Sequence, residues 1–227
     1  MPTFEPKTLD DWKDIDAKME TMGFAPEVEA SIFDRRYIHK ASSCVAISLY
    51  PVPYRAEIRV TISLQWELRN VRFEYSHETS VDVPDELNDQ PLRKSLEDVI
   101  KLFTWIRENP FPVSFPPDLS RMSVIGFTTR RYKPHYTFMQ GFDIGIGVSS
   151  SNTGTDKIMD VFLKYLYNSL IFHDVMFWKK IPIENVTPKT LTEFYEDCVR
   201  MASDPKNPFY EFYQSQFQND KTLQATS

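Results

Sequence analysis

Apolar positions recur every three or four residues near the start of the chain, across residues 8–22, at Leu9, Trp12, Ile15, Met19 and Met22. This spacing predicts an amphipathic helix, with Thr8 or Asp10 available as a cap and Gly23 suited to its end. Acidic residues outnumber basic ones 8 to 3 through residue 31. We interpret the outer side of this helix as a negative, solvated face.

The period changes to two between residues 32 and 83, which predicts β-strands with one wet face. The clearest alternation covers Ile58, Val60, Ile62, Leu64 and Trp66. Shorter apolar alternations precede it over residues 45–49 and follow it over residues 71–75, beyond a turn-like pair, Arg69 and Asn70. Pro51 and Pro53 separate the alternation at residues 45–49 from the one that begins at Ile58, because proline has no N–H group to donate within a central strand. An antiparallel meander of three or four strands is the expected result.

A second helix is predicted over residues 92–108. One stripe of that segment is apolar, at Leu92, Leu96, Val99, Ile100, Phe103 and Ile106. Such a stripe can cover the dry side of the sheet. The sequence therefore predicts the α+β class, with an antiparallel meander sheet packed by helices in the N-terminal half.

Four prolines between residues 109 and 120 mark the candidate domain boundary: Pro110, Pro112, Pro116 and Pro117. Proline continues neither a helix nor a central strand. We expect a helix-meander-helix unit over residues 1–109, a proline-rich strap or linker over 110–120, and a strand/helix unit over 121–227. One continuous domain is the alternative.

The second half predicts a mixture of strands and helices that ends in helices. Residues 122–139 are expected to form one strand or a hairpin broken at Pro134, and residues 143–148 a strand. Helices are expected over residues 156–171, from Thr187 and Pro188 to about residue 201, and from Asp204 and Pro205 onward.

Composition narrows the functional classes. Only 6 of 227 residues are glycine, well below the usual share of about 7%, which disfavours the glycine-rich loops of dinucleotide and P-loop enzymes. The net charge of −6 opposes general nucleic-acid binding. The two cysteines, Cys44 and Cys198, fit no metal or disulfide spacing, no run of 18 apolar residues occurs, and no leader opens the chain. We therefore expect a cytoplasmic protein that has no membrane partner.

The segment from residue 119 to residue 142 contains no acid, and its basic and aromatic residues are the best candidates for binding a polyanion. They are Arg121, Arg130, Arg131, Tyr132, Lys133 and His135. Arginine binds phosphate through two hydrogen bonds, and aromatic rings stack on bases. The alternative is a wet strand face whose charges pair with acids elsewhere.

A polar turn between the predicted strand 143–148 and helix 156–171 is a second candidate site. Its hydroxyls and glycine are Ser149, Ser150, Thr153, Gly154 and Thr155. The free N–H groups and dipole of a helix N-terminus would favour an anion there. The alternative is a purely structural turn in which Thr155 or Asp156 caps the helix.

Aromatic residues near the C-terminus recur at helical spacing, at Phe209, Phe212, Tyr213 and Phe217. Such a stripe either docks on its own domain or anchors a protein partner.

No catalytic, metal-ligating or cofactor-binding residue is predicted. The four histidines lack ligand spacing, no G-x-S-x-G motif occurs, and acids flank Cys198. The sequence favours a non-catalytic binding or regulatory protein that acts through protein–protein contacts, with self-association as one form. One alternative is a nucleic-acid or nucleotide-phosphate binder that uses residues 121–136. The other is a small transferase or hydrolase with an anion at residues 149–156.

Overall fold

The computed structural model describes residues 4–27, 31–82, 87–108, 123–124, 136–139, 144–150, 158–165, 174–182, 185 and 187–218. The chain divides into two compact units. The first unit comprises residues 1–65, 75–102 and 206–227, and the second comprises residues 66–74 and 103–205.

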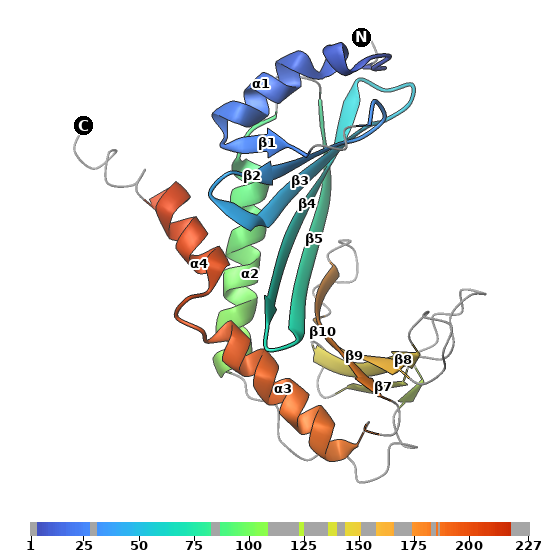
Figure 1. Ribbon diagram of the computed structural model, residues 1–227, viewed down its shortest axis with the longest axis vertical. Coiled ribbons are helices and arrows are strands. Elements are labelled where there is room, and N and C mark those ends of the chain that lie inside the picture. The colour runs from blue at the N-terminus through green and yellow to red at the C-terminus, as the bar shows by residue number, and fades with distance from the viewer. Residues whose placement is uncertain are drawn as a thin grey trace. The chain divides into compact units, whose positions relative to one another are not determined.

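The first unit is an antiparallel meander with helices (Figure 1). Its strand order is β1-β2-β3-β4-β5, an antiparallel meander as the sequence predicts, with five strands where three or four were expected. The elements that lie wholly or mostly in this unit are η1 (Leu9–Trp12), α1 (Lys13–Thr21), β1 (Phe24–Pro26), β2 (Arg35–His39), β3 (Ser42–Pro51), β4 (Glu57–Leu68), β5 (Val71–Asp82), α2 (Gln90–Glu108), α4 (Pro208–Tyr213) and η4 (Gln214–Gln218).

One face of this sheet forms the core. Residues directly opposite each other on β3 and β4 are buried in pairs, such as Ile47 with Ile62 and Val45 with Leu64. Met19 of α1 and Leu92 of α2 are buried beside this face and line the same small cavity as Ile47 and Ile62. Both helices therefore cover the apolar side of the sheet, as the stripe on residues 92–108 predicts.

The predicted end of the first helix at Gly23 is confirmed. Gly23 has a φ of +86°, a left-handed conformation that glycine adopts without steric cost. A Cβ atom at this position would lie 2.7 Å from Nε2 of His39. Gly23 therefore both stops α1 and allows β2 to approach.

The second unit contains a further antiparallel sheet and one long helix. Its strand order is β5-β10-β9-β8-β7-β6, where only the first residues of β5 belong to this unit. The elements are β6 (Ser123–Val124), β7 (Tyr136–Met139), β8 (Ile144–Ser150), β9 (Ile158–Tyr165), β10 (Asp174–Pro182) and α3 (Pro188–Ala202). The pairing of β6 with β7 agrees with the hairpin alternative for residues 122–139.

Three phenylalanine rings meet in the core of the second unit. Phe73, Phe103 and Phe177 lie with ring centroids 4.9 to 5.9 Å apart. Thr187 caps α3, its hydroxyl accepting the Thr190 N–H at 3.3 Å, as the sequence predicts. Lys179 of β10 pairs with Asp197 of α3 at 3.5 Å, which ties the helix to the same face as Phe177.

The predicted helix over residues 156–171 is wrong. Residues 158–165 form β9, which pairs with β8 on one side and β10 on the other. The run from Ile158 to Tyr165 is almost continuously apolar, a pattern that a buried strand and a buried helix share. The neighbouring strands decide the outcome, and the sequence analysis assigned no strand to β10.

The last helix begins later than predicted. Asn207, rather than Asp204 or Pro205, lies at its start, and its side-chain oxygen accepts hydrogen bonds from the N–H groups of Phe209 and Tyr210. Asparagine is a favoured N-cap, and Pro208 fits the first helical position.

The α+β class is confirmed, with helices at the C-terminal end. Within the described ranges, no helix has the length and apolar character needed to cross a membrane. The proposed boundary at residues 109–120 lies outside the described residues and stays a prediction.

Candidate functional site

The basic and aromatic residues proposed to bind a polyanion all lie outside the described residues: Arg121, Arg130, Arg131, Tyr132, Lys133 and His135. Their role stays a prediction.

The proposed anion site at residues 149–155 depended on a following helix, and residues 158–165 form a strand instead. Ser149 and Ser150 belong to β8, where they lie opposite Asp160 and Met159 of β9. Thr153, Gly154 and Thr155 lie outside the described residues. Because residues 158–165 form a strand, they supply neither the helix dipole nor the free N–H groups that the anion site required.

The C-terminal aromatic stripe packs on its own unit. Phe209, Phe212 and Phe217 are buried, and the Phe212 ring lies 4.5 Å from the ring of His39. Tyr213 donates its hydroxyl hydrogen to Glu97 of α2 at 2.9 Å. The partner-binding assignment is therefore corrected for the three phenylalanines, because the chain itself covers their rings.

His39 is a buried structural residue. Its Nδ1 accepts the Ala41 N–H at 3.1 Å, and its ring meets Phe24 and Phe212 edge to face. Burial lowers the pKa of His39, although a hydrogen bond to the Met22 backbone opposes this shift. The imidazole is consequently neutral near pH 7, and both of its nitrogens have backbone contacts.

A buried ionic cluster joins α1 to β2, and the sequence analysis missed it. Asp16 accepts hydrogen bonds from the Arg35 guanidinium and from the Tyr37 hydroxyl, the latter at 2.7 Å. Burial, the largest cause, raises the pKa of Tyr37, and the Asp16 carboxylate raises it further. None of the three described cavities of this unit is lined by these residues. The cluster therefore holds the fold together rather than meeting a substrate.

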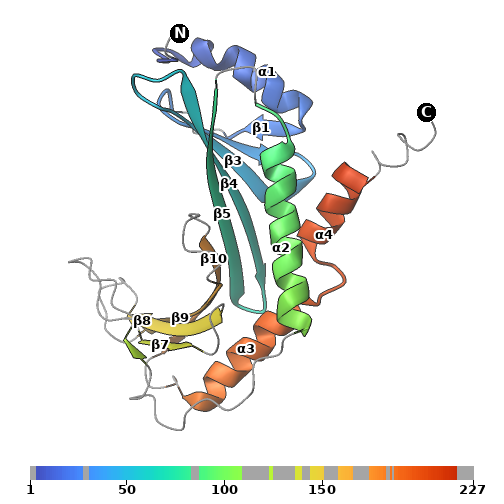
Figure 2. The same ribbon diagram turned by 180° about the vertical axis from the view of Figure 1, so that it is seen from behind.

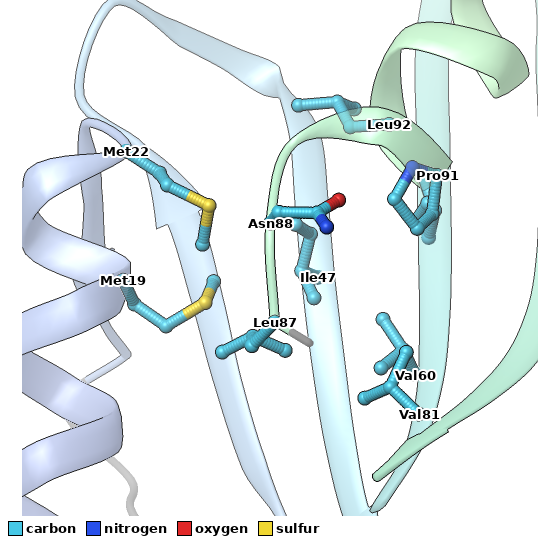
Figure 3. Close-up of a pocket in the computed structure, with 10 residues that line it drawn as sticks. Met19, Met22, Ile47, Val60, Val81, Leu87, Asn88, Pro91 and Leu92 are labelled. Atoms are coloured by element: carbon cyan, nitrogen blue, oxygen red, sulfur yellow. The ribbon is translucent and has the colours of Figure 1, made fainter. Parts of the chain in front are cut away.

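The best-enclosed cavity of the first unit is too small for a ligand. It lies between α1, the sheet and the start of α2, and its walls include Met19, Ile47 and Leu87 (Figure 3). Its volume is about 10 Å³, roughly the room that one water molecule needs. It is a packing gap in the core.

A larger groove of about 560 Å³ opens to solvent beside α4 and the β2–β3 turn. Its titratable groups are engaged elsewhere. Lys40 pairs with Glu20 at 2.9 Å, and His39 contacts backbone and aromatic rings. The residues that the structure describes include no group of three side chains able to hold a metal ion. This groove thus lacks the converging acid, base or ligand groups of an active site.

The most unusual surface of the first unit is apolar. Of the five large hydrophobic side chains that are exposed among the described residues, four lie at one end of this unit, and we call them the apolar tip: Leu9, Phe33, Tyr50 and Tyr54. Phe33 is 73% exposed and Tyr54 is 89% exposed. The fifth, Tyr210, lies on α4.

Hydrogen bonds bring the three segments of the apolar tip together. The Trp12 indole N–H donates to the Ile32 carbonyl at 3.1 Å, which places η1 beside the segment that carries Phe33. Arg35 lies opposite Leu49, so that segment runs beside the end of β3. Figures 1 and 2 show the N-terminal helical turn and the loop between β3 and β4 at the same end of the sheet.

Tyr54 occupies a backbone conformation that does not suit it. The Arg55 N–H donates to the Val52 carbonyl at 3.2 Å and closes a turn with Pro53 and Tyr54 at its centre. Tyr54 has a φ of +65°, as the third residue of a type II turn requires, and glycine or asparagine normally stands there. The left-handed conformation costs a residue with a side chain about 1–2 kcal/mol, and a ring this exposed recovers little of that cost by packing.

No protein-family model, curated protein or solved structure matches this chain. The function must therefore be argued from the surfaces of the two units.

Proposed function

We propose that this protein is a non-catalytic, regulatory protein-binding protein that inserts its apolar tip into a pocket of another protein, a second copy of the chain being the first partner to test. Tyr54 carries this proposal. An aromatic ring exposed on a turn that strains its own backbone does not serve stability, and strain of this kind points to a role in contact.

The composition of the apolar tip supports binding to protein. Tyrosine and phenylalanine bury large area at a small entropy cost, which makes them common at the centre of interfaces. The four residues come from three separate segments that the fold holds at one end of the sheet. A clustered apolar surface of this kind marks interaction sites on monomers.

The free cysteines support a reducing compartment such as the cytoplasm. Cys198 is fully buried, and burial raises the pKa of its thiol well above the ordinary value. Neither cysteine is in a disulfide.

Self-association is tested by sedimentation velocity over a roughly hundredfold range of protein concentration. We expect the average mass of the native protein to rise with concentration, and we expect the double variant Phe33→Ser/Tyr54→Gly to remain monomeric. Tyr210→Ser is the matched control, because it removes an exposed ring of the same unit outside the apolar tip.

Binding to a different protein is tested by photo-crosslinking in the cells that make the chain. A photoreactive phenylalanine is placed at position 33, 54 or 210 in turn. We expect discrete adducts from positions 33 and 54 and none from position 210. A chain that stays monomeric, and whose position 54 crosslinks no more than position 210, would refute the proposal.

A further inference from the structure

The two faces of the second unit's sheet differ in what covers them. Alternate residues of β10 face opposite sides. Phe177 and Ile181 are buried, and Lys179 reaches α3, so this face is the core side. Trp178 and Lys180 therefore lie on the other face. We call it the open face, because α3 lies on the core side and is the one helix that falls wholly within the described residues of this unit.

Trp178 is a half-buried indole ring with two cations close to it. The Arg72 guanidinium lies 5.4 Å from the ring centroid and the Lys180 ammonium 5.9 Å. Glu74 binds the Arg72 guanidinium at 2.9 Å and orients it beside the ring. Both distances lie within the roughly 6 Å of the ring centroid at which a cation is attracted to an aromatic face.

The strand register extends this surface across the sheet. Trp178 lies opposite Phe162 of β9, and Phe162 lies opposite Gly147 of β8. The next row toward the start of β10 pairs Met176 with Lys164 and then with Gly145. By register, aromatic positions on β10 and β9 are thus adjacent, and two glycine positions follow on β8.

Charge distinguishes this unit from the first. The first unit contains 19 acidic and 13 basic residues, whereas the second contains 13 of each. The whole net charge of −6 therefore belongs to the first unit. On the open face, the described side chains of Arg72 and Lys180 are basic, against the acidic Glu74. The second unit consequently repels an anionic polymer far less than the first.

We propose that the open face of the second unit binds single-stranded nucleic acid, with one base stacked on Trp178 and the neighbouring phosphates held by Arg72 and Lys180. Base stacking on aromatic rings together with cations along the backbone is the recurring chemistry of single-strand binding. A duplex is excluded from this surface, because its bases are already stacked on each other. The site is separate from the apolar tip.

The test is fluorescence anisotropy of a labelled, single-stranded oligothymidine or oligouridine of about 15 nucleotides, titrated with the full chain. We expect binding at low salt that weakens as salt rises from about 50 to 200 mM. Trp178→Ala should lower affinity at least about fivefold, the effect of losing one stacked base. Trp178→Phe retains a ring and should keep most of the affinity, which separates stacking from damage to the fold.

Lys180→Gln tests the phosphate contact. Removing one contact to a single strand should reduce the slope of log affinity against log salt by about 0.7. The double variant Phe33→Ser/Tyr54→Gly should bind the oligonucleotide as the native chain does, so that failure here and failure of the protein-binding proposal are distinguishable. The absence of binding at low salt, equal binding by Trp178→Ala, or equal binding of a duplex of the same length would each overturn the inference.

Discussion

The two units pack their strands in the same way, but the side chains that each leaves exposed differ in kind. Each has an antiparallel sheet with one face buried against helices. The first unit holds all of the net negative charge and exposes its large apolar residues, among those described, mainly at one end, whereas the second is neutral and has an indole near two cations on its open face. The comparison teaches that composition averaged over the whole chain conceals two units with different surface chemistry.

The largest expected effect tests whether the two cores are separate. Phe177→Ala removes a ring that contacts Phe73 and Phe103, and should lower the free energy of unfolding by about 3–5 kcal/mol. Ile62→Ala is the matched change in the first unit and should cost about 2–5 kcal/mol. Urea titration gives the totals. Hydrogen exchange should show faster exchange in β10 and α3 for the first variant, and in β3 and β4 for the second; the same pattern from both would break the comparison.

Gly23→Ala comes next and concerns the first unit alone. The φ of +86° is unfavourable for alanine, and the added Cβ would lie 2.7 Å from Nε2 of His39. The left-handed conformation and the displaced ring together should cost roughly 2–3 kcal/mol in thermal or urea unfolding. A cost below about 0.5 kcal/mol would show that the β2–β3 turn yields easily, and that the first unit is less tightly packed than its burial indicates.

Acid should weaken the first unit through His39. Because folding lowers the pKa of His39 below 6.5, the unfolded chain takes up the proton more readily. Stability is therefore fully present above pH 6.5 and falls as the pH drops through 6.5 toward the lower folded pKa. Urea titrations from pH 7.5 to pH 5 measure the slope, and His39→Gln should remove this part of it. An unchanged slope in the variant would mean that another group titrates in this range.

Tyr54→Gly should have the smallest effect on stability and an opposite sign. Relief of the left-handed strain should exceed the extra chain entropy of glycine and leave a net gain of about 0.5–1 kcal/mol. Thermal unfolding measures it. A stability gain together with a loss of association would sharpen the assignment of the apolar tip to binding. A loss of stability would show that Tyr54 packs in solution.

The sequence predicted the first unit far better than the second, for reasons that lie in particular residues. The alternation from Ile58 to Trp66 is unambiguous because one face of β4 is wet. In the run from Ile158 to Tyr165, Phe162 interrupts the alternation between Asp160 and Lys164, and the pairing with β8 and β10 shows that the run is a strand. The local sequence pattern is enough to predict a strand that has one wet face. It is not enough to predict a strand whose conformation depends on the strands beside it.

The candidate sites were harder to predict than the elements. Tyr54 gives no signal in the sequence beyond Pro53, because its importance comes from a turn that would normally contain glycine or asparagine. The aromatic stripe was recognised, but whether Phe212 meets a partner or His39 depends on an approach between positions 39 and 212 that periodicity cannot reveal. Arg72 and Trp178 are likewise more than a hundred residues apart in the chain.

The placement of residues 206–218 in the first unit affects how this protein is made. Ribosomes release the chain from its N-terminus, so the strands β1 to β5 and the helices α1 and α2 emerge about a hundred residues before the segment that covers His39. At roughly 5–20 residues per second, that surface waits some 5–20 seconds for its cover. During this interval the nascent chain presents an apolar groove that chaperones can bind, and a message truncated before codon 206 would leave the groove open permanently.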